Sequence, residues 1–361
     1  MTRPVSRSLP ICAGVTALLA AAVASPHAET HRFVPTAFHQ TFSAAHPAAL
    51  RIKSGDTVRT TTLEDETAAG GETGAGGSPL TGPFYVDGAE PGDLLVVTLT
   101  KLDPNRATGH SGGVMAPGAV PEGSLSRRRG DAGRVPWIID AAKGVVRLDL
   151  PALMPNVNWR SRFRDAALEL PLQPSLGAIG VAPAGDAAGG AASGAMPGPF
   201  GGHLEAAGIV AGARVMLPVL QRGALLFLGH GHARQGDGAA AGGGIETSLD
   251  VEFSVEVVKK QEWPHSSVAR PSTVVGEFSQ GWPRVETSTE LMTVASGASL
   301  SDALRQATLE LHHWLDDDFG MSERTVNIFL GQAIEYEIAN ATAPHVTVVA
   351  KVRKAFLPAA N

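Results

Sequence analysis

The sequence predicts a β-rich protein of the α+β type, a mixed α/β fold with a β-sandwich-like body and a C-terminal helical hairpin. Two observations support this prediction. Short β-branched or alternating apolar runs, bounded by Gly and Pro, recur along the chain to about residue 258. From residue 299 the apolar residues recur at helical spacing instead. We therefore expect one domain over residues 29–361, mostly β to about residue 298 and helix-containing from residue 299.

The expected strands are short and rich in Val, Leu and Ile. They are residues 92–102, 144–150, 213–220, 224–230, 245–258, 271–279 and 345–352. Two passages rich in Gly, Ala and Ser, residues 68–78 and 182–199, have no hydrophobic period and are predicted to be long loops. Such loops are often functional in a compact domain, and plain surface insertions are the alternative.

The helical part has recognisable start and stop signals. Ser299 and Asp302 resemble a capping box, and Gly320 is a stop. Ser322 can cap a second helix. The apolar stripes are Leu300, Leu304, Ala307, Leu311, Trp314 and Leu315 in the first helix, and Val326, Phe329, Leu330, Ala333 and Ile334 in the second.

The N-terminal segment has the composition of an export signal. Two arginines precede an apolar stretch that ends in the small residues 22–24, so residues 1–28 are interpreted as a signal peptide, with cleavage after Ala24 or Ala28. The stretch is short for a membrane span, which disfavours a retained anchor. The location is then periplasmic or secreted. Cys12, the single cysteine, lies in this segment, so the mature chain would have no thiol nucleophile, thiolate ligand or disulfide.

The composition and net charge indicate that nucleic acids and membranes are not expected partners. With 43% hydrophobic and 18% charged residues among 361, the chain is typical of a soluble globular protein. A formal net charge of −6 provides no broad basic surface, so nucleic acid is not an expected partner. No membrane association is expected once the signal peptide is removed.

The stretch FLGHGHARQGDG, residues 227–238, carries the strongest chemical signal. An apolar strand ends in His230 and His232, which share a face because side chains alternate along a strand. A Gly-rich loop follows, and closing it as a hairpin places Glu246 opposite the two histidines. Two imidazoles and one carboxylate are ligand types of a catalytic Zn²⁺ site. The alternative is a polar turn with exposed histidines.

Three further patterns are weaker. His203 and Glu205 follow a flexible, Gly-rich passage of a kind often found at binding sites. Ser111 lies in a Gly-x-Ser-x-Gly pattern, which would make it an esterase nucleophile, but no strand–turn–helix context surrounds it. His312 and Asp316 are one helical turn apart and are interpreted as a solvated helix face.

Several segments in order resemble the acetamidase/formamidase family. They are LTGPFYVDGAEPGDLLVV (80–97), DPNRATG (103–109), LPLQPSLGAIGVAPAG (170–185), PGPFGGHLE (197–205), MLPVLQRGALLFLGHGHARQGDG (216–238) and GGIETSLDVEFSV (243–255). The resemblance extends to the C-terminus and covers nearly the whole mature chain. It implies a β-rich fold, association of subunits, a divalent metal and hydrolysis of short amides to a carboxylate and ammonia. It also places five residues on acidic or polar positions of the family motifs, namely Asp65, His232, Gln235, Asp237 and Glu246.

The chain also departs from the family's pattern. The family usually has Gly-Gly-Asn-Met-Asp where this chain has residues 201–205, with His203 and Glu205. It has Gly-Asp where this chain has Gly229 and His230, and a glutamate where this chain has Ala239. The gained histidines suit a more nitrogen-rich metal shell. Alternatively, the losses leave an inactive periplasmic protein that binds a small ligand.

We therefore predict a metal-dependent amidohydrolase that cleaves a small linear amide, with Zn²⁺ as the expected ion and a homo-oligomeric assembly. The expected ligands are drawn from His203, His230, His232 and Asp237. Glu246 is the expected proton acceptor and donor. Asp65 is one of the expected catalytic residues, and either Asp65 or Glu205 would orient a ligand histidine. Gln235 would contact the substrate or support the ligands.

Overall fold

The computed structural model of the chain describes the body of the protein. The described residues are 28–64, 78–116, 118–121, 123–124, 133–149, 152, 168–185, 190–261, 281–342 and 345–358. Outside these residues lie Asp65, the expected strand 271–279 and all of the predicted signal peptide except Ala28.

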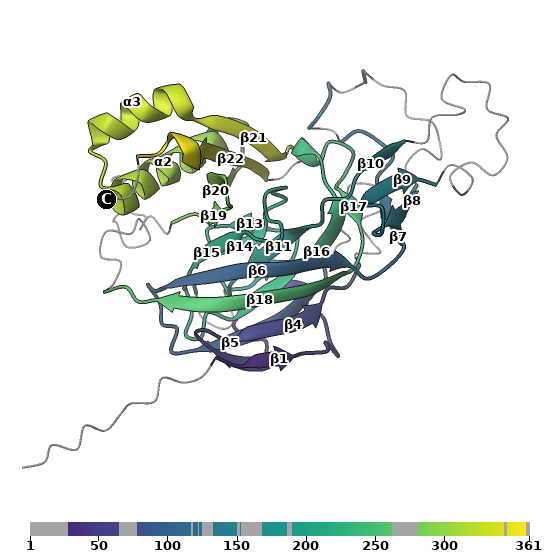
Figure 1. Cartoon of the computed structure of the whole chain (residues 1–361), viewed down its shortest axis with the longest axis horizontal. Helices are drawn as coiled ribbons and strands as arrows, with labels where there is room; N and C mark the ends of the chain where they lie inside the picture. The colour runs from purple at the N-terminus through teal and green to yellow at the C-terminus, as the bar shows by residue number, and fades with distance from the viewer. Residues whose placement is uncertain are drawn as a thin grey trace, which may run out of the picture.

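Two large sheets form the body (Figure 1). The first has nine strands in the order β1 (Thr30–Arg32), β4 (Thr57–Thr61), β18 (Leu249–Val258), β6 (Leu94–Pro104), β15 (Arg214–Pro218), β19 (Arg284–Glu286), β20 (Glu290–Gly297), β22 (Val346–Arg353) and β21 (Glu335–Asn340). Neighbours are antiparallel except β1 and β4, which are parallel.

The second sheet has eleven strands and carries the candidate site. Its main path runs β10 (Glu169–Pro171), β9 (Val145–Leu148), β8 (Val135–Asp140), β7 (Thr108–Ser111), β17 (Ile245–Glu246), β16 (Leu226–Arg234), β11 (Ser175–Gly180), β14 (Gly201–His203) and β13 (Pro197–Gly198). β5 (Leu80–Asp87) also pairs with β16, and β3 (Leu50–Lys53) pairs with β5. A separate two-stranded sheet joins β2 (Thr41–Phe42) and β12 (Ala192–Ser193).

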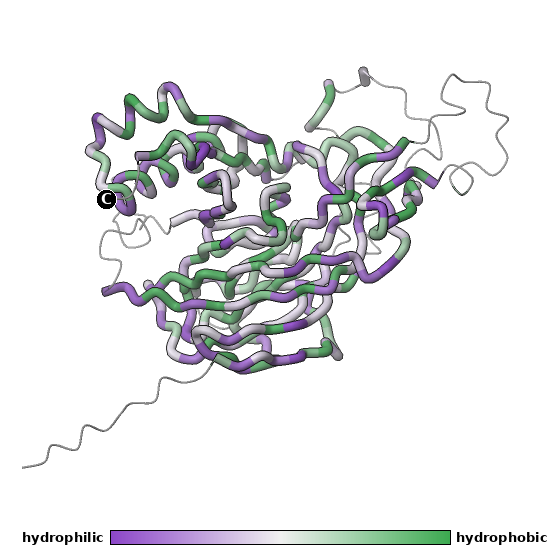
Figure 2. The backbone as a smooth tube through the Cα atoms, in the orientation of Figure 1, coloured by the Kyte–Doolittle hydropathy of each residue, from purple (hydrophilic) through white to green (hydrophobic). Residues whose placement is uncertain are grey.

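The main hydrophobic core contains inward-facing residues of both large sheets. β18 shows the pattern that produces it, since Leu249, Val251 and Phe253 are buried and alternate with less buried polar residues. Phe253 meets Phe84 of β5 edge to face, with ring centroids 5.3 Å apart. The hydropathy of the backbone follows the same arrangement, with apolar segments running through the middle of the body (Figure 2). The predicted β-sandwich-like body is therefore present.

The helical hairpin was also predicted correctly. α2 (Leu300–Phe319) begins after Ser299, whose Oγ accepts a hydrogen bond from the backbone N–H of Asp302, and ends at Gly320 in the left-handed conformation. α3 (Glu323–Ala333) is capped by Ser322 in the same way. α2 packs on β20 and β22 through Ala303, Ala307, Leu311, Trp314 and Leu315. Of the predicted stripe, Leu300 and Leu304 are exposed, although Ala303 between them is buried.

Three expectations from the sequence need correction. The single strand expected over residues 245–258 is divided, because β17 stays in the eleven-stranded sheet while β18 crosses to the nine-stranded sheet. The passage expected as a loop over residues 182–199 contains the short strands β12 and β13. The strand expected to end at His230 continues to Arg234. Among the described residues, no helix is long and apolar enough to cross a membrane.

Candidate metal centre

The hairpin of β16 and β17 brings the predicted histidines and glutamate together. His232 of β16 is the direct cross-strand partner of Glu246 of β17. Its Nε2 lies 3.0 Å from Glu246 Oε1, and the Nε2 of His230 lies 3.5 Å from the same oxygen. All three side chains are buried. The two histidines are therefore not exposed on a polar turn, which was the alternative interpretation of the sequence.

A second strand adds two more donors. β14 pairs with β11 and ends at His203, which places His203 and the following Glu205 beside the hairpin. Glu205 Oε1 lies 2.6 Å from the Nε2 of His203 and 3.1 Å from the Nε2 of His230. The five side chains thus form two overlapping groups that could hold a metal ion. One is His203, Glu205 and His230, and the other is His230, His232 and Glu246.

The backbone is shaped to aim these side chains inward. Glu205 and His230 have φ values of 57° and 54°, in the left-handed region that residues with a Cβ rarely adopt. Each such residue costs about 1–3 kcal/mol, and strained positions of this kind cluster at functional sites. Gly177 of β11 is the floor of the cluster, since a Cβ there would come within 2.7 Å of Glu205, His230 and His232. Only glycine leaves room for this convergence.

The electrostatics favour an ionised Glu205. Burial by itself would raise the pKa of this carboxyl group, but the neighbouring charges of His203, His230 and His232 outweigh burial and hold its pKa well below the ordinary value. The amide of Gln235 donates a hydrogen bond of 2.7 Å to Glu205 Oε2, so this oxygen is fixed and Oε1 faces the histidines. The predicted contact of Gln235 with the site is thus an amide that holds a carboxylate in place.

The donor set fits a divalent ion. Three imidazole nitrogens and two carboxylate oxygens converge in a buried space, and nitrogen and oxygen ligands of these types suit Zn²⁺. Among the described residues, several buried atoms here have no hydrogen-bond partner. They are Nδ1 of His203, Oε1 of Glu205, Nδ1 of His232, Oε1 of Gln235 and Oε2 of Glu246. Buried polar atoms are normally satisfied, so these positions indicate that something further binds in this space.

Two predicted site residues do not join the cluster. Asp237 is exposed at the start of the 3₁₀-helix η1 (Asp237–Ala239) and belongs to neither metal-binding group of the described residues. Asp237 is exposed, whereas Glu205 places a carboxylate oxygen within the buried cluster. Asp65 lies outside the described residues.

The neighbouring Glu64 is a buried carboxylate that the sequence analysis missed. It accepts a hydrogen bond of 3.1 Å from Arg134 and forms an ion pair with Arg106. Its Oε1 lies 2.7 Å from the Nδ1 of His110, which is the cross-strand partner of Glu246. His110 lies in the pattern Gly-His-Ser-Gly, which the sequence analysis interpreted only for Ser111. Nothing in this pattern indicates that the histidine lies beside the hairpin.

The weaker sequence candidates have other structural roles. Ser111 Oγ donates to the carbonyl oxygen of Gly112 and accepts from Trp137 Nε1, and the described residues directly after β7, 112–116, form no helix. The geometry therefore gives no support to an esterase nucleophile. His312 and Asp316 are part of α2 and belong to neither metal-binding group found in the described part of the chain.

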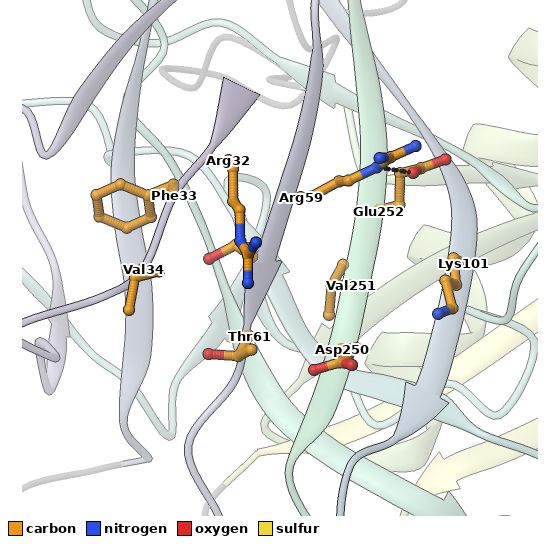
Figure 3. A pocket seen from close by; sticks show the side chains of 10 residues that line it. Arg32, Phe33, Val34, Arg59, Thr61, Lys101, Asp250, Val251 and Glu252 are labelled. Atoms are coloured by element: carbon orange, nitrogen blue, oxygen red, sulfur yellow. Dashed lines mark hydrogen bonds and ion pairs between the residues drawn. The ribbon is translucent and has the colours of Figure 1, made fainter. Parts of the chain in front are cut away.

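A cavity of about 440 Å³ lies on another part of the molecule, over β1, β4, β6 and β18 (Figure 3). Its charged residues are Arg32, Arg59, Lys101, Asp250 and Glu252, and Arg59 pairs with Glu252 at 2.5 Å. No histidine lines this cavity. The convergent ligands are in the buried cluster, so the candidate chemistry belongs there.

Comparison with known proteins identifies the family. The model of the acetamidase/formamidase family matches residues 160–359, more than half of the chain. An acetamidase from Mycolicibacterium smegmatis is 26% identical over 284 residues, which cover 64% of this chain and 69% of that protein.

Two solved structures are each similar to this chain across 90% of its length. A predicted acetamidase/formamidase from Thermoanaerobacter tengcongensis has 25% identity, 96% of its own chain covered and a TM-score of 0.69. An acetamidase from Bacillus halodurans has 26% identity, 98% of its own chain covered and a TM-score of 0.70. With the fold, the hairpin and the buried donors all in place, this chain belongs to the acetamidase/formamidase family.

Proposed function

We propose that the protein is a metal-dependent amidohydrolase that cleaves the C–N bond of a small linear amide, such as formamide or acetamide, to a carboxylate and ammonia. The family and its acetamidase relatives support amide hydrolysis. The observation that carries the metal dependence is the convergence of His203, His230, His232, Glu205 and Glu246 on one buried space.

Four of these residues are the proposed metal ligands, with Zn²⁺ as the expected ion. His203, His230 and His232 each turn Nε2 toward a carboxylate oxygen, and Glu205 is ionised and fixed by Gln235. A bound divalent ion supplies positive charge that polarises an amide carbonyl and makes a water molecule more acidic. Glu205 is suited to hold the ion rather than a proton, because its pKa is well below the ordinary value.

Glu246 is the proposed general base and acid. Its Oε1 faces His232 and His230, while Oε2 has no hydrogen-bond partner among the described residues. The free oxygen can take a proton from the attacking water and return it to the leaving nitrogen, which departs readily only when protonated. Gly243 leaves space beside the carboxylate, since a Cβ there would lie 2.9 Å from Glu246 Oε1.

The direct test combines metal analysis with an assay. The purified protein should contain close to one zinc ion per chain and release ammonia from formamide or acetamide. A chelator should remove both the metal and the activity, and added Zn²⁺ should restore them. A protein that binds no metal, or that hydrolyses these amides equally well after chelation, would contradict the proposal.

The inactive ligand-binding homologue is the alternative that the sequence left open. It is not favoured by the structure, because the residues that replace family positions, His203, Glu205 and His230, are drawn into one cluster with His232 and Glu246. An active preparation would exclude this alternative, and a metal-bound preparation that hydrolyses none of a broad amide panel would support it.

We also infer an exported, homo-oligomeric protein. The export signal of residues 1–28 supports a periplasmic or secreted location, and the family resemblance supports association of subunits. N-terminal sequencing of the protein from its natural host should begin at residue 25 or 29. Light scattering should give a mass of more than one chain.

A further inference from the structure

Four polar side chains lie in one row across neighbouring strands of the eleven-stranded sheet. Ser175 of β11 is the cross-strand partner of His232, His232 is the partner of Glu246, and Glu246 is the partner of His110. Directly paired residues of antiparallel strands project to the same face, with Cβ atoms about 4.5–5.5 Å apart. Ser175 therefore lies beside His232, on the side away from Glu246.

Both members of the Ser175–His232 pair have unmet hydrogen-bonding capacity. Ser175 is 1% exposed and His232 is 0% exposed. Within the described part of the chain, Ser175 Oγ has no hydrogen-bond partner, and neither has His232 Nδ1. Leaving a buried polar group unsatisfied costs about 1–3 kcal/mol. The two groups lie on directly paired strand positions and make no hydrogen bond to each other as the side chains stand, so each is available to the other.

The other histidine of β16 already shows the same arrangement. Ser78 Oγ lies 3.2 Å from the Nδ1 of His230, on the side of the ring opposite the carboxylates. His230 thus has Nε2 toward the cluster and a serine hydroxyl group at Nδ1, and His232 has Nε2 toward the cluster and a serine on the paired strand position. The ring of His232 also lies against β11, because a Cβ on Gly177 would come within 2.7 Å of its Cε1, the carbon between the two ring nitrogens.

We propose that Ser175 is a positioning residue whose hydroxyl group hydrogen-bonds to His232 Nδ1 and holds this imidazole ready for the metal. The proposal rests on the proposed function, because it concerns a metal ligand. Metal binding through Nε2 requires the proton on Nδ1, and a partner for that proton fixes the tautomer and the ring orientation.

A hydroxyl group suits both states of this ring. Nε2 of His232 faces Glu246 Oε1 at 3.0 Å, so Nδ1 is the ring nitrogen left for Ser175. A metal ion held at Nε2 would require the proton on Nδ1. Ser175 Oγ can accept from Nδ1 when that nitrogen carries a proton and donate to it when it does not, because a hydroxyl group does both. A carboxylate in this position could only accept.

The test is the zinc affinity of the metal-free protein, measured by competition with a chromogenic chelator. We expect S175A to bind Zn²⁺ about 10- to 100-fold more weakly than wild type, the usual effect of removing the partner of a ligand histidine. S175T keeps the hydroxyl group and should stay within about threefold, by the same reasoning. T60V is the matched control, because Thr60 Oγ1 is also buried with no hydrogen-bond partner among the described residues but lies in β4 of the other sheet. Its affinity should equal that of wild type.

A second measurement needs no destabilising substitution. In zinc-loaded wild-type protein labelled with ¹⁵N-histidine, the His232 signals should show a proton on Nδ1 that exchanges slowly with water. The signals are assigned by their loss in H232Q. A folded S175A with wild-type affinity, or a His232 ring with its proton on Nε2 in the zinc-loaded protein, would overturn the proposal. If wild type itself binds no zinc, the proposed function fails instead, so the two failures are distinguished.

Discussion

The roles of single residues in the cluster follow from which of their atoms are already engaged. Glu205 has Oε2 held by a hydrogen bond from Gln235 and Oε1 within 3.1 Å of the Nε2 atoms of His203 and His230, so both oxygens have a close polar neighbour. Glu246 has Oε1 beside histidines, but its Oε2 has no hydrogen-bond partner among the described residues. The two carboxylates are therefore not equivalent although both are buried. This difference leads to separate expectations for the two residues.

The role of Glu246 can be tested by E246Q, which keeps the shape of the side chain and removes its basicity. We expect amide hydrolysis to fall by at least about 100-fold, as is typical when a general acid–base group is lost. The zinc content should remain near that of wild type, because three histidines and Glu205 remain. Ammonia release and metal analysis of the same preparation check this. Loss of the metal together with activity would instead make Glu246 a ligand.

The floor of the cluster can be tested by G177A. A methyl group there would meet Glu205 Oε1 and the ring carbons of His230 and His232 at 2.5–2.7 Å, so these side chains must shift. We expect a large loss of both zinc affinity and activity. G331A in α3 is the control, because a Cβ at that position meets nothing within 4 Å. Wild-type zinc binding by G177A would show that the convergence is not needed.

At the scale of elements, the β16–β17 hairpin and the crossing of the chain to β18 place the site at the junction of the two sheets. The segment that follows β7 covers the Gly-rich loop, since Ala116 N–H donates to the carbonyl oxygen of Ala240. The residue after β21 also contacts the loop, because Ala341 N–H donates to the carbonyl oxygen of Gly238. The helical hairpin packs instead on β20 and β22, away from the metal ligands.

Because the helices pack away from the site, loss of the N-terminal cap of α2 should lower the stability of the protein without changing its activity. S299A removes the side chain that accepts from Asp302 N–H, and loss of such a cap costs about 1 kcal/mol of stability. Urea unfolding should show that decrease while kcat and KM stay unchanged. A change in kcat of more than a few fold would indicate that α2 and the metal centre are coupled.

At the scale of the whole molecule, the charge of Glu205 links stability to pH. Its pKa in the folded protein is depressed, so its ionised form stabilises the fold at pH values above the ordinary glutamate pKa of 4.5. That stabilisation is lost as the pH falls from about 4.5 through the lower pKa of the folded state. Metal-free wild type should lose stability on acidification over this window more steeply than E205Q, as measured by urea unfolding. Equal slopes for the two proteins would contradict the depressed pKa.

Metal binding should also stabilise the whole fold, because the proposed ligands come from two strands, β14 and β16, and from the segment after β14. A ligand that binds only the folded state adds about 2.7 kcal/mol at a free concentration 100 times its Kd. Thermal unfolding should therefore occur at a lower temperature after chelation and return to the original temperature with added Zn²⁺. The same midpoint with and without metal would mean that the ion does not bind the native cluster.

The sequence by itself determined the elements whose signals are local. Alternating apolar residues predicted the strands, and Ser299, Gly320 and Ser322 predicted the limits of the helices. The pairing of His232 with Glu246 was also accessible, because a hairpin joins neighbouring segments. Resemblance to the family added the expectation of amide hydrolysis.

Only the tertiary structure decided which distant residues complete the site. β14 brings His203 and Glu205 to the hairpin through β11. β7 brings His110 to its other side, where Glu64 contacts His110 from the segment after β4. Strand order and cross-strand register between segments far apart in the chain leave no periodic trace in the sequence. The exposed position of Asp237, outside both groups of the described residues that could hold a metal ion, had no signal in the sequence for the same reason.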